Sequence, residues 1–309
     1  MIYTITLNPA IDKTVVIENF SAGAVNRVLS VREDAGGKGI NVSKCLKNLG
    51  QESVAVMILA GRTGKQLDTM LKKMKIHMLR IHAQGENRTN LKIIDPVKGS
   101  NTDINEPGPH IDAQLLAQMK KKMEHSVGKG DIVVLSGSLP KDTSAELYGD
   151  WTRSFRKLGA SVYLDADGVP MEKGMAAIPY MIKPNDAELA RLLGKDSLTL
   201  EEMIAEGIRL RDTGIREVVI SLGGDGALFI SNDGVFRAKG LDVPVKSTVG
   251  AGDSMVAAMA FGHARNLSRE EKIRLAVAMG AASVMQDGSQ SPEAELVWEL
   301  AKKVQVEKL

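Results

Sequence analysis

Short apolar runs alternate with amphipathic segments along most of the 309-residue chain. The runs predict strands at residues 2–7, 53–59, 131–136, 161–165, 180–183 and 217–222. Most of them are continuously apolar rather than alternating, which is typical of strands that are covered on both faces. The pattern therefore favours a mostly parallel sheet buried between helices.

The segments between these strands carry the 3.6-residue periodicity of helices. Helices are predicted at residues 40–48, 65–73, 112–125, 144–158, 188–193 and 200–212. From Ala251 onward the pattern is almost entirely helical, with breaks near Asn266 and at residues 287–291. Strands that alternate with helices in this way give right-handed crossovers in an α/β fold. Because no repeat or linker divides the chain, we expect one domain over residues 1–309.

Two stretches depart from this pattern, because their polar and apolar residues alternate as in strands exposed on one face. The first contains residues 13–18 and 28–33, and the second is residues 88–107, where a Lys-Gly-Ser-Asn turn separates two strand-like pieces. We interpret them as a small β-flap, formed by about residues 12–34 and 86–108, that can cover a site. An ordinary extension of the sheet edge is an equally good interpretation.

The composition excludes several classes of function. The chain has 40 Lys and Arg against 38 Asp and Glu, a net charge of +2, whereas a protein that coats nucleic acid needs a basic field. The one cysteine, Cys45, excludes an internal disulfide, and no Cys/His metal cluster is present. No signal peptide is recognisable, and no apolar run approaches the roughly 18 residues of a membrane helix. We expect a cytoplasmic enzyme that acts on small molecules, without nucleic-acid or membrane partners.

Residues 247–262, STVGAGDSMVAAMAFG, combine glycines, one acid and a helix of small residues. A helix N-terminus carries free N–H groups, and glycine lets a ligand approach the backbone, so Gly250, Ala251 and Gly252 form a candidate anion site. Asp253 would repel that anion, but it can accept a proton from a hydroxyl that attacks it. At an ordinary pKa of about 3.9 the acid needs only correct placement. The alternative is an acid that stabilises the helix dipole by about 0.3–1 kcal/mol.

Two common nucleotide-binding motifs fail. A dinucleotide fingerprint, G-x-G-x-x-G, needs a third glycine three residues after Gly252, but Met255 stands at that position. A P-loop needs Ser or Thr after Gly64-Lys65, but Gln66 stands there. The failed fingerprint argues against a dehydrogenase. A small-molecule sensor on a kinase fold would keep the glycines and lose the acid. Because Asp253 is present, the sequence favours an enzyme over a sensor.

Further polar clusters lie at predicted strand ends, where open α/β sheets bind their ligands. In AGGKGIN, Gly37, Lys38 and Asn41 are candidate ligand contacts, and a tight turn with a solvated lysine is the alternative. Ser138 in SGSLP suits a sugar hydroxyl or a phosphate, unless it only caps a helix.

Two more clusters follow later strands. In KPNDAE, Asn185 and Glu188 have the spacing of a capping box, and the functional alternative places them near phosphates and a hydrated Mg²⁺. The turn SLGGDGA, residues 221–227, fits either a simple hairpin or backbone contacts to a triphosphate or ribose.

In this order the segments TLNPAID, GGKGIN, SGSLP, KPNDAE, SLGGDGA and GAGD span most of the chain and resemble the PfkB family of sugar kinases. AGGKGINVSKCLKNLG is similar to the N-terminal signature of that family and STVGAGDSMVAAMA to the C-terminal one. TLNPAID and NRTN resemble its phosphosugar branch, which includes 6-phosphofructokinases and tagatose-6-phosphate kinases. GGKGINVSKCLK and NTDINEPGP are most similar to its 1-phosphofructokinase members.

The resemblance implies a ribokinase-like three-layer α/β/α fold and an ATP-dependent kinase of ketohexose phosphates. Fructose 1-phosphate is the expected substrate, and tagatose 6-phosphate or fructose 6-phosphate is the alternative. It implies that Asp253 is the catalytic base and that Gly250, Ala251 and Gly252 form the anion hole. The β-flap would cover the sugar and mediate a homodimer. ATP and Mg²⁺ are the implied cofactors, and some members also use a monovalent cation such as K⁺, whose ligands residues 285–290 do not identify.

The resemblance also assigns binding residues. Sugar hydroxyls are expected at Asp12, Gly37 and Asn41, and Ser138 is expected to contact either a hydroxyl or the phosphate of the sugar. The phosphate already on the sugar is expected at Lys38 and Arg88, with Arg27 reaching it from the β-flap. Lys183, Asn185 and Glu188 would serve ATP and Mg²⁺, with Glu188 acting through water. The nucleotide itself is expected at Ser221, Gly223, Gly224 and Gly226.

Overall fold

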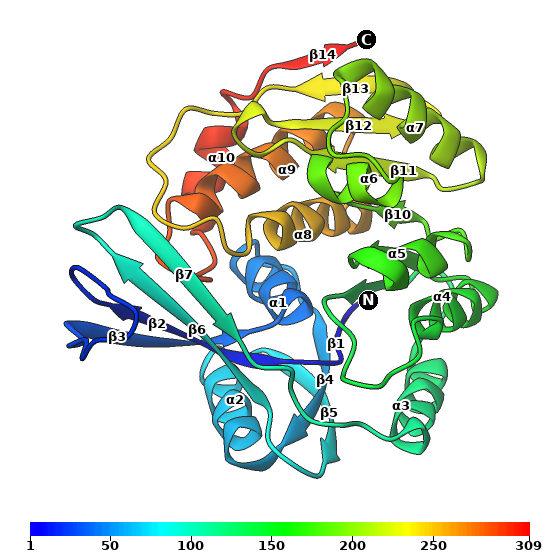
Figure 1. Cartoon of the computed structure of the whole chain (residues 1–309). Helices are drawn as coiled ribbons and strands as arrows, with labels where there is room; N and C mark the ends of the chain where they lie inside the picture. Colours follow the sequence, from blue (N-terminus) through cyan, green and yellow to red (C-terminus); the bar gives the residue numbers. More distant parts are fainter.

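The computed structural model describes residues 1–309 and contains a ten-stranded main sheet in the order β14-β13-β12-β11-β10-β9-β8-β1-β4-β5 (Figure 1). The bounds are β1 Ile2–Thr6, β4 Val54–Ala60, β5 His77–Ala83, β8 Ile132–Ser136, β9 Ser161–Asp165, β10 Met181–Ile182, β11 Glu217–Ser221, β12 Ala227–Ser231, β13 Gly234–Ala238 and β14 Val306–Lys308. Neighbours from β5 to β11 pair in parallel, with Thr4 of β1 opposite Ala55 and Val134, and β11 to β14 pair antiparallel. The predicted mostly parallel sheet is confirmed.

Helices cover both faces of this sheet, which confirms the three-layer α/β/α architecture (Figure 1). One face carries α1 Lys38–Asn48, α2 Gly61–Lys73, α8 Ala251–Ala264, α9 Arg269–Val284 and α10 Ala294–Ala301. The other carries α3 Ala113–Ser126, α4 Leu147–Lys157, α5 Gly168–Met175, α6 Asp186–Leu192 and α7 Leu200–Asp212. None of the helices combines the length and the hydropathy that crossing a membrane requires.

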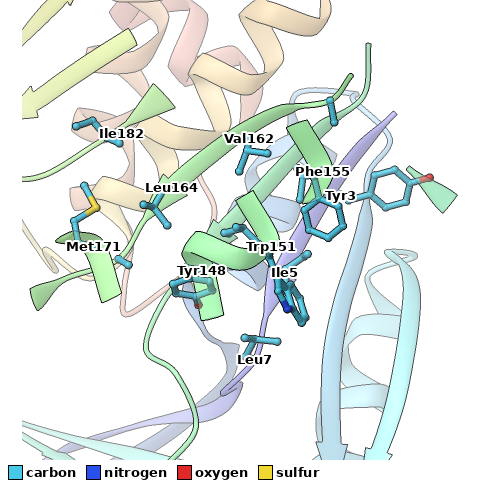
Figure 2. Close-up of a cluster of buried hydrophobic side chains, with 14 of the residues drawn as sticks. Tyr3, Ile5, Leu7, Tyr148, Trp151, Phe155, Val162, Leu164, Met171 and Ile182 are labelled. Carbon is cyan, nitrogen blue, oxygen red and sulfur yellow. The ribbon is translucent and has the colours of Figure 1, made fainter. Parts of the chain in front are cut away.

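The apolar runs are continuous because each strand packs against helices on both sides. Successive side chains of a strand point to opposite faces. In β1, Tyr3 and Ile5 therefore lie in the cluster that contains Trp151 of α4 (Figure 2), whereas Ile2 lies in the cluster formed with α1, α8, α9 and α10. Phe155 meets Trp151 edge to face within the first cluster, with ring centroids 6.0 Å apart.

The β-flap is a separate four-stranded sheet in the order β3-β2-β6-β7, so the interpretation as an edge extension was wrong. Its strands are β2 Ala10–Val16, β3 Ser30–Gly36, β6 Arg88–Asp95 and β7 Ser100–Asn105. It projects from the main body on the side of α1 (Figure 1). Val15, Ile17 and Ile93 form its own small apolar cluster, whereas every residue of β7 is exposed.

Several elements differ from the predicted pattern. Helix α2 begins at Gly61 rather than residue 65, because the carboxylate of Glu86 accepts hydrogen bonds from the N–H groups of Arg62 and Thr63. Strand β5 was not predicted, since it lies at the sheet edge and mixes exposed polar with buried apolar residues. The antiparallel strands β12 to β14 and helix α5 were missed too. The predicted breaks after α8 and α9 are confirmed.

Candidate active site

Two cavities lie at the carboxyl ends of the main-sheet strands. The larger, about 730 Å³, is bordered by residues that follow β10 and β11 and by the start of α8. The smaller, about 310 Å³, is bordered by residues that follow β1 and β8 and by the start of α1. Binding at this edge is the rule for open α/β sheets, so both cavities are candidate ligand sites.

The larger cavity has a polar and an apolar wall. Asn185, Ser221, Gly223, Gly224 and Gly226 contribute to the polar wall, together with Ala251 and Gly252 at the start of α8. The apolar wall is formed by Leu241, Val243, Val245, Met255, Val277 and Val284. A ligand with a flat apolar part and an anionic part fits such a lining.

The glycine-rich turn of this wall is a hairpin between β11 and the antiparallel strand β12, with a short 3₁₀ turn at Gly223–Asp225. Gly226 has a φ of 97°, and a Cβ there would lie 2.0 Å from the carbonyl oxygen of Ala238. The simple-hairpin interpretation is thus correct as structure, and the same residues also line the cavity.

No hydrophobic residue lines the smaller cavity. Its lining residues are Thr6, Asn8, Gly37, Lys38, Arg88, Asn90, Asn105, Ser136, Gly137, Ser138 and Asp167. Arg88 and Asn90 come from β6 and Asn105 from β7, so the β-flap forms one wall. Lys38 and Arg88 give this polar cavity two cationic side chains.

Buried polar atoms without hydrogen-bond partners gather around the smaller cavity. Thr6 Oγ1, Asn8 Oδ1, Asn90 Oδ1 and Ser136 Oγ belong to residues that line it. Asn41 Oδ1 and Asp165 Oδ2 belong to the partners of Asp253 and Lys38. Folded proteins leave few such atoms unpaired, since each costs about 1–3 kcal/mol. Their concentration here suits a ligand that is rich in hydroxyl groups.

Asp253 lies in the first turn of α8 and is only 5% exposed. Its Oδ2 accepts a hydrogen bond of 2.8 Å from Nδ2 of Asn41. The helix begins at Gly250, which has a left-handed φ of 82°, and no side chain caps its first turn. Of the N–H groups beside the larger cavity, that of Ala251 makes only a long bond of 3.4 Å to the Thr248 carbonyl, so this helix start can still donate to another acceptor.

The pKa of Asp253 is raised to about 6, first by burial and then by the negative charge of Asp165, while Lys38 and Lys183 oppose the rise. The expectation of an ordinary aspartate was therefore wrong, because sequence alone reveals neither the burial of this carboxylate nor the second carboxylate beside it. The group is still mostly ionised at neutral pH, and it is a stronger base than an exposed aspartate.

Asp165 holds the two lysines between the cavities. This carboxylate is 1% exposed, and its Oδ1 lies 3.2 Å from Nζ of Lys38 and 3.7 Å from Nζ of Lys183. A Cβ on Gly252 would lie 2.8 Å from Nζ of Lys183, so this ammonium reaches the start of α8. Burial lowers the pKa of Lys38, but the charges of Asp165, Asp253 and Glu188 outweigh it and raise the pKa above its usual value.

Arg88 and Ser138 meet at the mouth of the smaller cavity. The Arg88 guanidinium donates to the carbonyl of Asn8 at 3.2 Å, to the carbonyl of Glu106 at 3.4 Å and to Oγ of Ser138 at 3.4 Å. Nδ2 of Asn8 also donates to Ser138 Oγ, at 3.4 Å. These bonds are long and the guanidinium is half-buried, so its donors can turn to an anionic ligand.

Asp12 lies on β2 opposite Asn90 of β6, whose Nδ2 donates to Asp12 Oδ1 at 2.9 Å. A Cβ on Gly36 would lie 2.1 Å from Asp12 Oδ2, and one on Gly37 would lie 2.6 Å from the Thr6 methyl group. The glycines of the AGGKG run thus make room for side chains of the protein itself, which is a packing role that the sequence did not indicate.

Asn185 and Glu188 form a capping box at the start of α6, which is the structural alternative for this motif. Asn185 Oδ1 accepts from the Glu188 N–H at 2.7 Å, and Glu188 Oε2 accepts from the Asn185 N–H at 2.9 Å. Asn185 nevertheless lines the larger cavity, and the Glu188 charge acts on Lys38. Arg27 is exposed, makes no hydrogen bond or salt bridge, and lines neither cavity.

The sequence pattern assigned no role to Asn8, Asn90 or Asp165, which belong to the site. Asn8 and Asp165 end the TLN and SVYLD strand segments, so the strand-end rule alone would have found them. Asn90 lies two residues after Arg88 on the same strand and therefore on the same face.

The sequence profile described as "pfkB family carbohydrate kinase" matches residues 3–296. The 1-phosphofructokinase of Bacillus subtilis is 34% identical over 309 residues, covering 100% of each chain. That of Escherichia coli K12 is 35% identical over 283 residues, or 92% of this chain and 90% of the relative.

Solved structures agree with these matches. Phosphofructokinase-2 from Escherichia coli in complex with fructose-6-phosphate superposes with a TM-score of 0.91 at 26% identity, covering 98% of each chain. The same enzyme in complex with potassium gives a TM-score of 0.92 at 27% identity, again over 98% of each chain. The chain belongs to the pfkB family of carbohydrate kinases and is an ATP-dependent sugar phosphotransferase.

Proposed function

We propose that the protein transfers the γ-phosphate of ATP to a ketohexose phosphate, and that this substrate is fructose 1-phosphate, which gives fructose 1,6-bisphosphate. The observation that carries the proposal is the polar cavity lined by both Lys38 and Arg88, whose Lys38 also feels the charge of the Asn41-bound carboxylate of Asp253. An uncharged sugar needs no cationic clamp of this kind. The names of the relatives that are 34–35% identical point to the same substrate.

In this proposal the smaller cavity holds the sugar. The planar Arg88 fork binds the phosphate already present, with Lys38 and Ser138 beside it, because a guanidinium matches phosphate geometry with two donors. Asp12, Asn41 and the backbone at Gly37 bind sugar hydroxyls. The β-flap, which supplies Arg88 and Asn90, closes over the ring.

The larger cavity holds the nucleotide. Its apolar wall packs against the base, and the turn with Ser221, Gly223, Gly224 and Gly226 holds the ribose and phosphates by backbone contacts. Asn185 and Lys183 guide the phosphates toward the first turn of α8. Lys183 is 4% exposed and lies against Gly252, so its charge is directed at that point.

The chemistry takes place where the cavities meet. A free primary hydroxyl of the sugar attacks the γ-phosphorus, forming a new O–P bond while the bond to the bridging oxygen breaks and ADP leaves. Asp253 takes the hydroxyl proton, and Asn41 holds the carboxylate in place. The N–H groups of Gly250, Ala251 and Gly252 stabilise the negative charge on the transferring group.

Magnesium belongs to the proposal as the partner of ATP. No group of three or more His, Cys, Asp or Glu side chains that could hold a metal is present, which fits an ion that keeps waters and binds mainly phosphate. Glu188 would contact it through water. When bound, Mg²⁺ neutralises phosphate charge. A K⁺ requirement is also proposed, since one solved relative is a potassium complex.

Two further expectations concern substrate choice and assembly. Fructose 6-phosphate is the second candidate, because a structural relative is a complex with it and a ketohexofuranose carries a CH₂O group at each end.

We also propose a homodimer through the β-flap, which exposes Val25, Leu29, Val31 and Ile104. Sedimentation of the protein with and without an Ile104→Glu change tests this association.

ADP release with fructose 1-phosphate, fructose 6-phosphate, tagatose 6-phosphate and fructose tests the substrate. We expect kcat/KM to be highest for fructose 1-phosphate and lowest for fructose. A preference for fructose 6-phosphate or tagatose 6-phosphate would replace the proposed substrate within the same mechanism. A preference for unphosphorylated fructose would refute the phosphate clamp.

A further inference from the structure

Lys44 on α1 is a buried lysine without a salt bridge. The residue is 6% exposed, and its Nζ donates to two backbone carbonyls, that of Ala35 at 2.9 Å and that of Ser289 at 2.7 Å. Burying an ammonium is costly unless its surroundings compensate it. Since the proposed chemistry does not use Lys44, this placement requires another explanation.

The first carbonyl belongs to the root of the β-flap, which is the start of β2 (residues 10–12) and the end of β3 (residues 34–36). Ala35 is in β3 opposite Ile11 of β2, and the next pair along these strands is Asp34 and Asp12. Lys44 therefore anchors the backbone beside the carboxylate that we assign to the sugar hydroxyls.

The second carbonyl belongs to the loop of residues 285–293 between α9 and α10, here called the α9–α10 loop. Arg32 of β3 binds the carbonyl of Asp287 and also the carboxylate of Asp34, at 2.8 Å. The loop thus lies against the root of the β-flap through two cationic side chains, Arg32 and Lys44.

The same loop reaches the proposed sugar site. The Ser289 hydroxyl is buried, lowers the pKa of Asp12, and has no hydrogen-bond partner at normal distance. Just before the loop, the carbonyl of Val284 accepts from the N–H groups of Lys246 and Ser247, and Val284 lines the nucleotide cavity.

The charge of Lys44 is matched to the acids around it. Burial lowers the pKa of Lys44, and the charges of Asp34 and Asp12 on the β-flap, with that of Asp253 on α8, oppose this. Burial in turn raises the pKa of Asp12, and Lys44 helps to keep it ionised. Without the ammonium, these carboxylates would face one another with less compensation.

We infer that Lys44 is a positioning residue for the phosphosugar, because its ammonium fixes the β-flap root and Ser289 on two sides of Asp12. The inference rests on the proposed function, since it takes Asp12 as the acceptor for sugar hydroxyls. Lys44 touches neither substrate and acts through Asp12 and Ser289.

The test compares Lys44→Met with Lys44→Arg in steady-state kinetics with both substrates varied. Methionine is also unbranched and only one atom shorter than lysine, and it removes the donors and the charge. We expect the KM for fructose 1-phosphate to rise about 10-fold or more, as the loss of charged hydrogen bonds predicts, with the KM for ATP and kcat within about threefold of wild type. Arginine should restore most of the sugar affinity, since it keeps the charge and the donors.

Asn48→Ala is the matched control. Asn48 lies one turn after Lys44 on α1 and donates to the carbonyls of Ser291 and Pro292 in the same loop, away from Asp12. We expect this variant to lower the melting temperature while both KM values stay unchanged. If Lys44→Met also lowers the melting temperature and leaves both KM values unchanged, Lys44 has only a structural role and the inference is wrong.

Arg32→Met serves if Lys44→Met does not fold, because Arg32 is half-buried and provides the other tether of the α9–α10 loop. It should raise the KM for the phosphosugar selectively, and an unchanged KM would overturn the inference. A wild-type protein that phosphorylates none of the phosphosugars refutes the proposed function instead. An active wild type with unaffected tether variants refutes only the role of Lys44.

Discussion

Asn41 Nδ2 donates a 2.8 Å hydrogen bond to Asp253 Oδ2, although 212 residues separate the two in the chain. The bond joins the first turn of α1 to the first turn of α8, and both residues are buried. The helix that follows the GGKG run is thereby fixed to the helix that carries the proposed base. Changes at either helix start should therefore alter catalysis more than folding.

Asp253→Asn should lower kcat by at least about 10²–10⁴-fold, the usual contribution of a general base. Asparagine keeps the size of the side chain and leaves the nucleotide cavity intact, so the affinity for ATP should change little. Stopped assays of ADP formation and calorimetric titration with an ATP analogue measure the two quantities. An Asn variant with wild-type turnover would refute the mechanism.

The same substitution should stabilise the protein at neutral pH. The folded-state pKa of Asp253 is raised to about 6, above an unfolded value of about 3.9, so the cost of ionising this group in the folded state grows as the pH rises between these two values and is complete above the folded one. The free energy of unfolding at pH 7.5 should rise by up to about 3 kcal/mol, at about 1.4 kcal/mol per pKa unit. Urea unfolding at pH 7.5 and pH 5 checks this, and the gain should shrink at pH 5.

The acid side of the pH profile should move when Asp165 is replaced. Below about pH 6 the raised pKa of Asp253 predicts a fall in kcat/KM as the base becomes protonated. Asp165→Asn removes the charge that helps to raise this pKa, so its acid limb should shift to lower pH even if the maximal rate drops. The phosphosugar itself has a second ionisation near pH 6. This ionisation affects wild type and Asp165→Asn equally, so the difference between their two acid limbs reports on Asp253.

Asp167→Asn is the control for this shift. Asp167 lines the smaller cavity two residues further along the chain, but it is exposed and is not among the principal causes of the raised pKa of Asp253. Its acid limb should coincide with that of wild type. Coincident limbs in the Asp165 and Asp167 variants would show that the Asp165 charge does not control the base.

Much of the architecture followed from the sequence because buried strands and glycine-rich strand ends leave local signals. Continuous apolar runs indicated strands covered on two sides, and Gly250 marked the start of α8. The start of α2 could not be predicted, since its cap is Glu86 from a loop 24 residues later. A cap that comes from a distant part of the chain leaves no local sequence signal, so it can be identified only from the structure.

The same limit applies to the candidate site. Asn41, Lys38 and Asp253 were each identified from their own motifs. Their effects on one another's pKa depend on Asp165, whose carboxylate holds Lys38 and Lys183 from distant segments of the chain. The raised pKa of Asp253 is a property of that arrangement and has no local signature. Lys44 likewise reads as a surface lysine of an amphipathic helix, although it is buried.

Arg88→Ala should raise the KM for the phosphosugar by about 10–100-fold, since charged hydrogen bonds contribute about 1.5–3 kcal/mol. The KM for ATP should stay within about twofold, because Arg88 borders only the smaller cavity. Lysine at this position should restore only part of the affinity, since it lacks the planar fork. Arg153→Ala, which removes an exposed arginine paired with Asp150 on α4, should leave both constants unchanged. Equal effects of Arg88→Ala on the two substrates would contradict the clamp.

Glu188→Gln separates the two interpretations of the KPNDAE motif. Glutamine can accept the N–H bond of Asn185 as glutamate does, so the capping box of α6 should persist. What it removes is the negative charge that would hold a water of the magnesium ion. The Mg²⁺ concentration for half-maximal activity should therefore rise about 10-fold or more, as for the loss of an outer partner of a metal, while the melting temperature stays unchanged.

The chain contains a control for this comparison in the capping box of α7, where Thr199 and Glu202 make the same pair of bonds. Glu202→Gln changes an equivalent capping box away from the residues that line the two cavities. It also removes an exposed ion pair with Lys195, which contributes little to stability, so it should leave the Mg²⁺ requirement unchanged and the melting temperature almost unchanged. If Glu188→Gln behaves in the same way, Glu188 only caps α6. A selective rise in the Mg²⁺ requirement, with equal melting temperatures in the two variants, would mean that one side chain serves both the helix and the metal, because the cap needs an acceptor whereas the metal needs a charge.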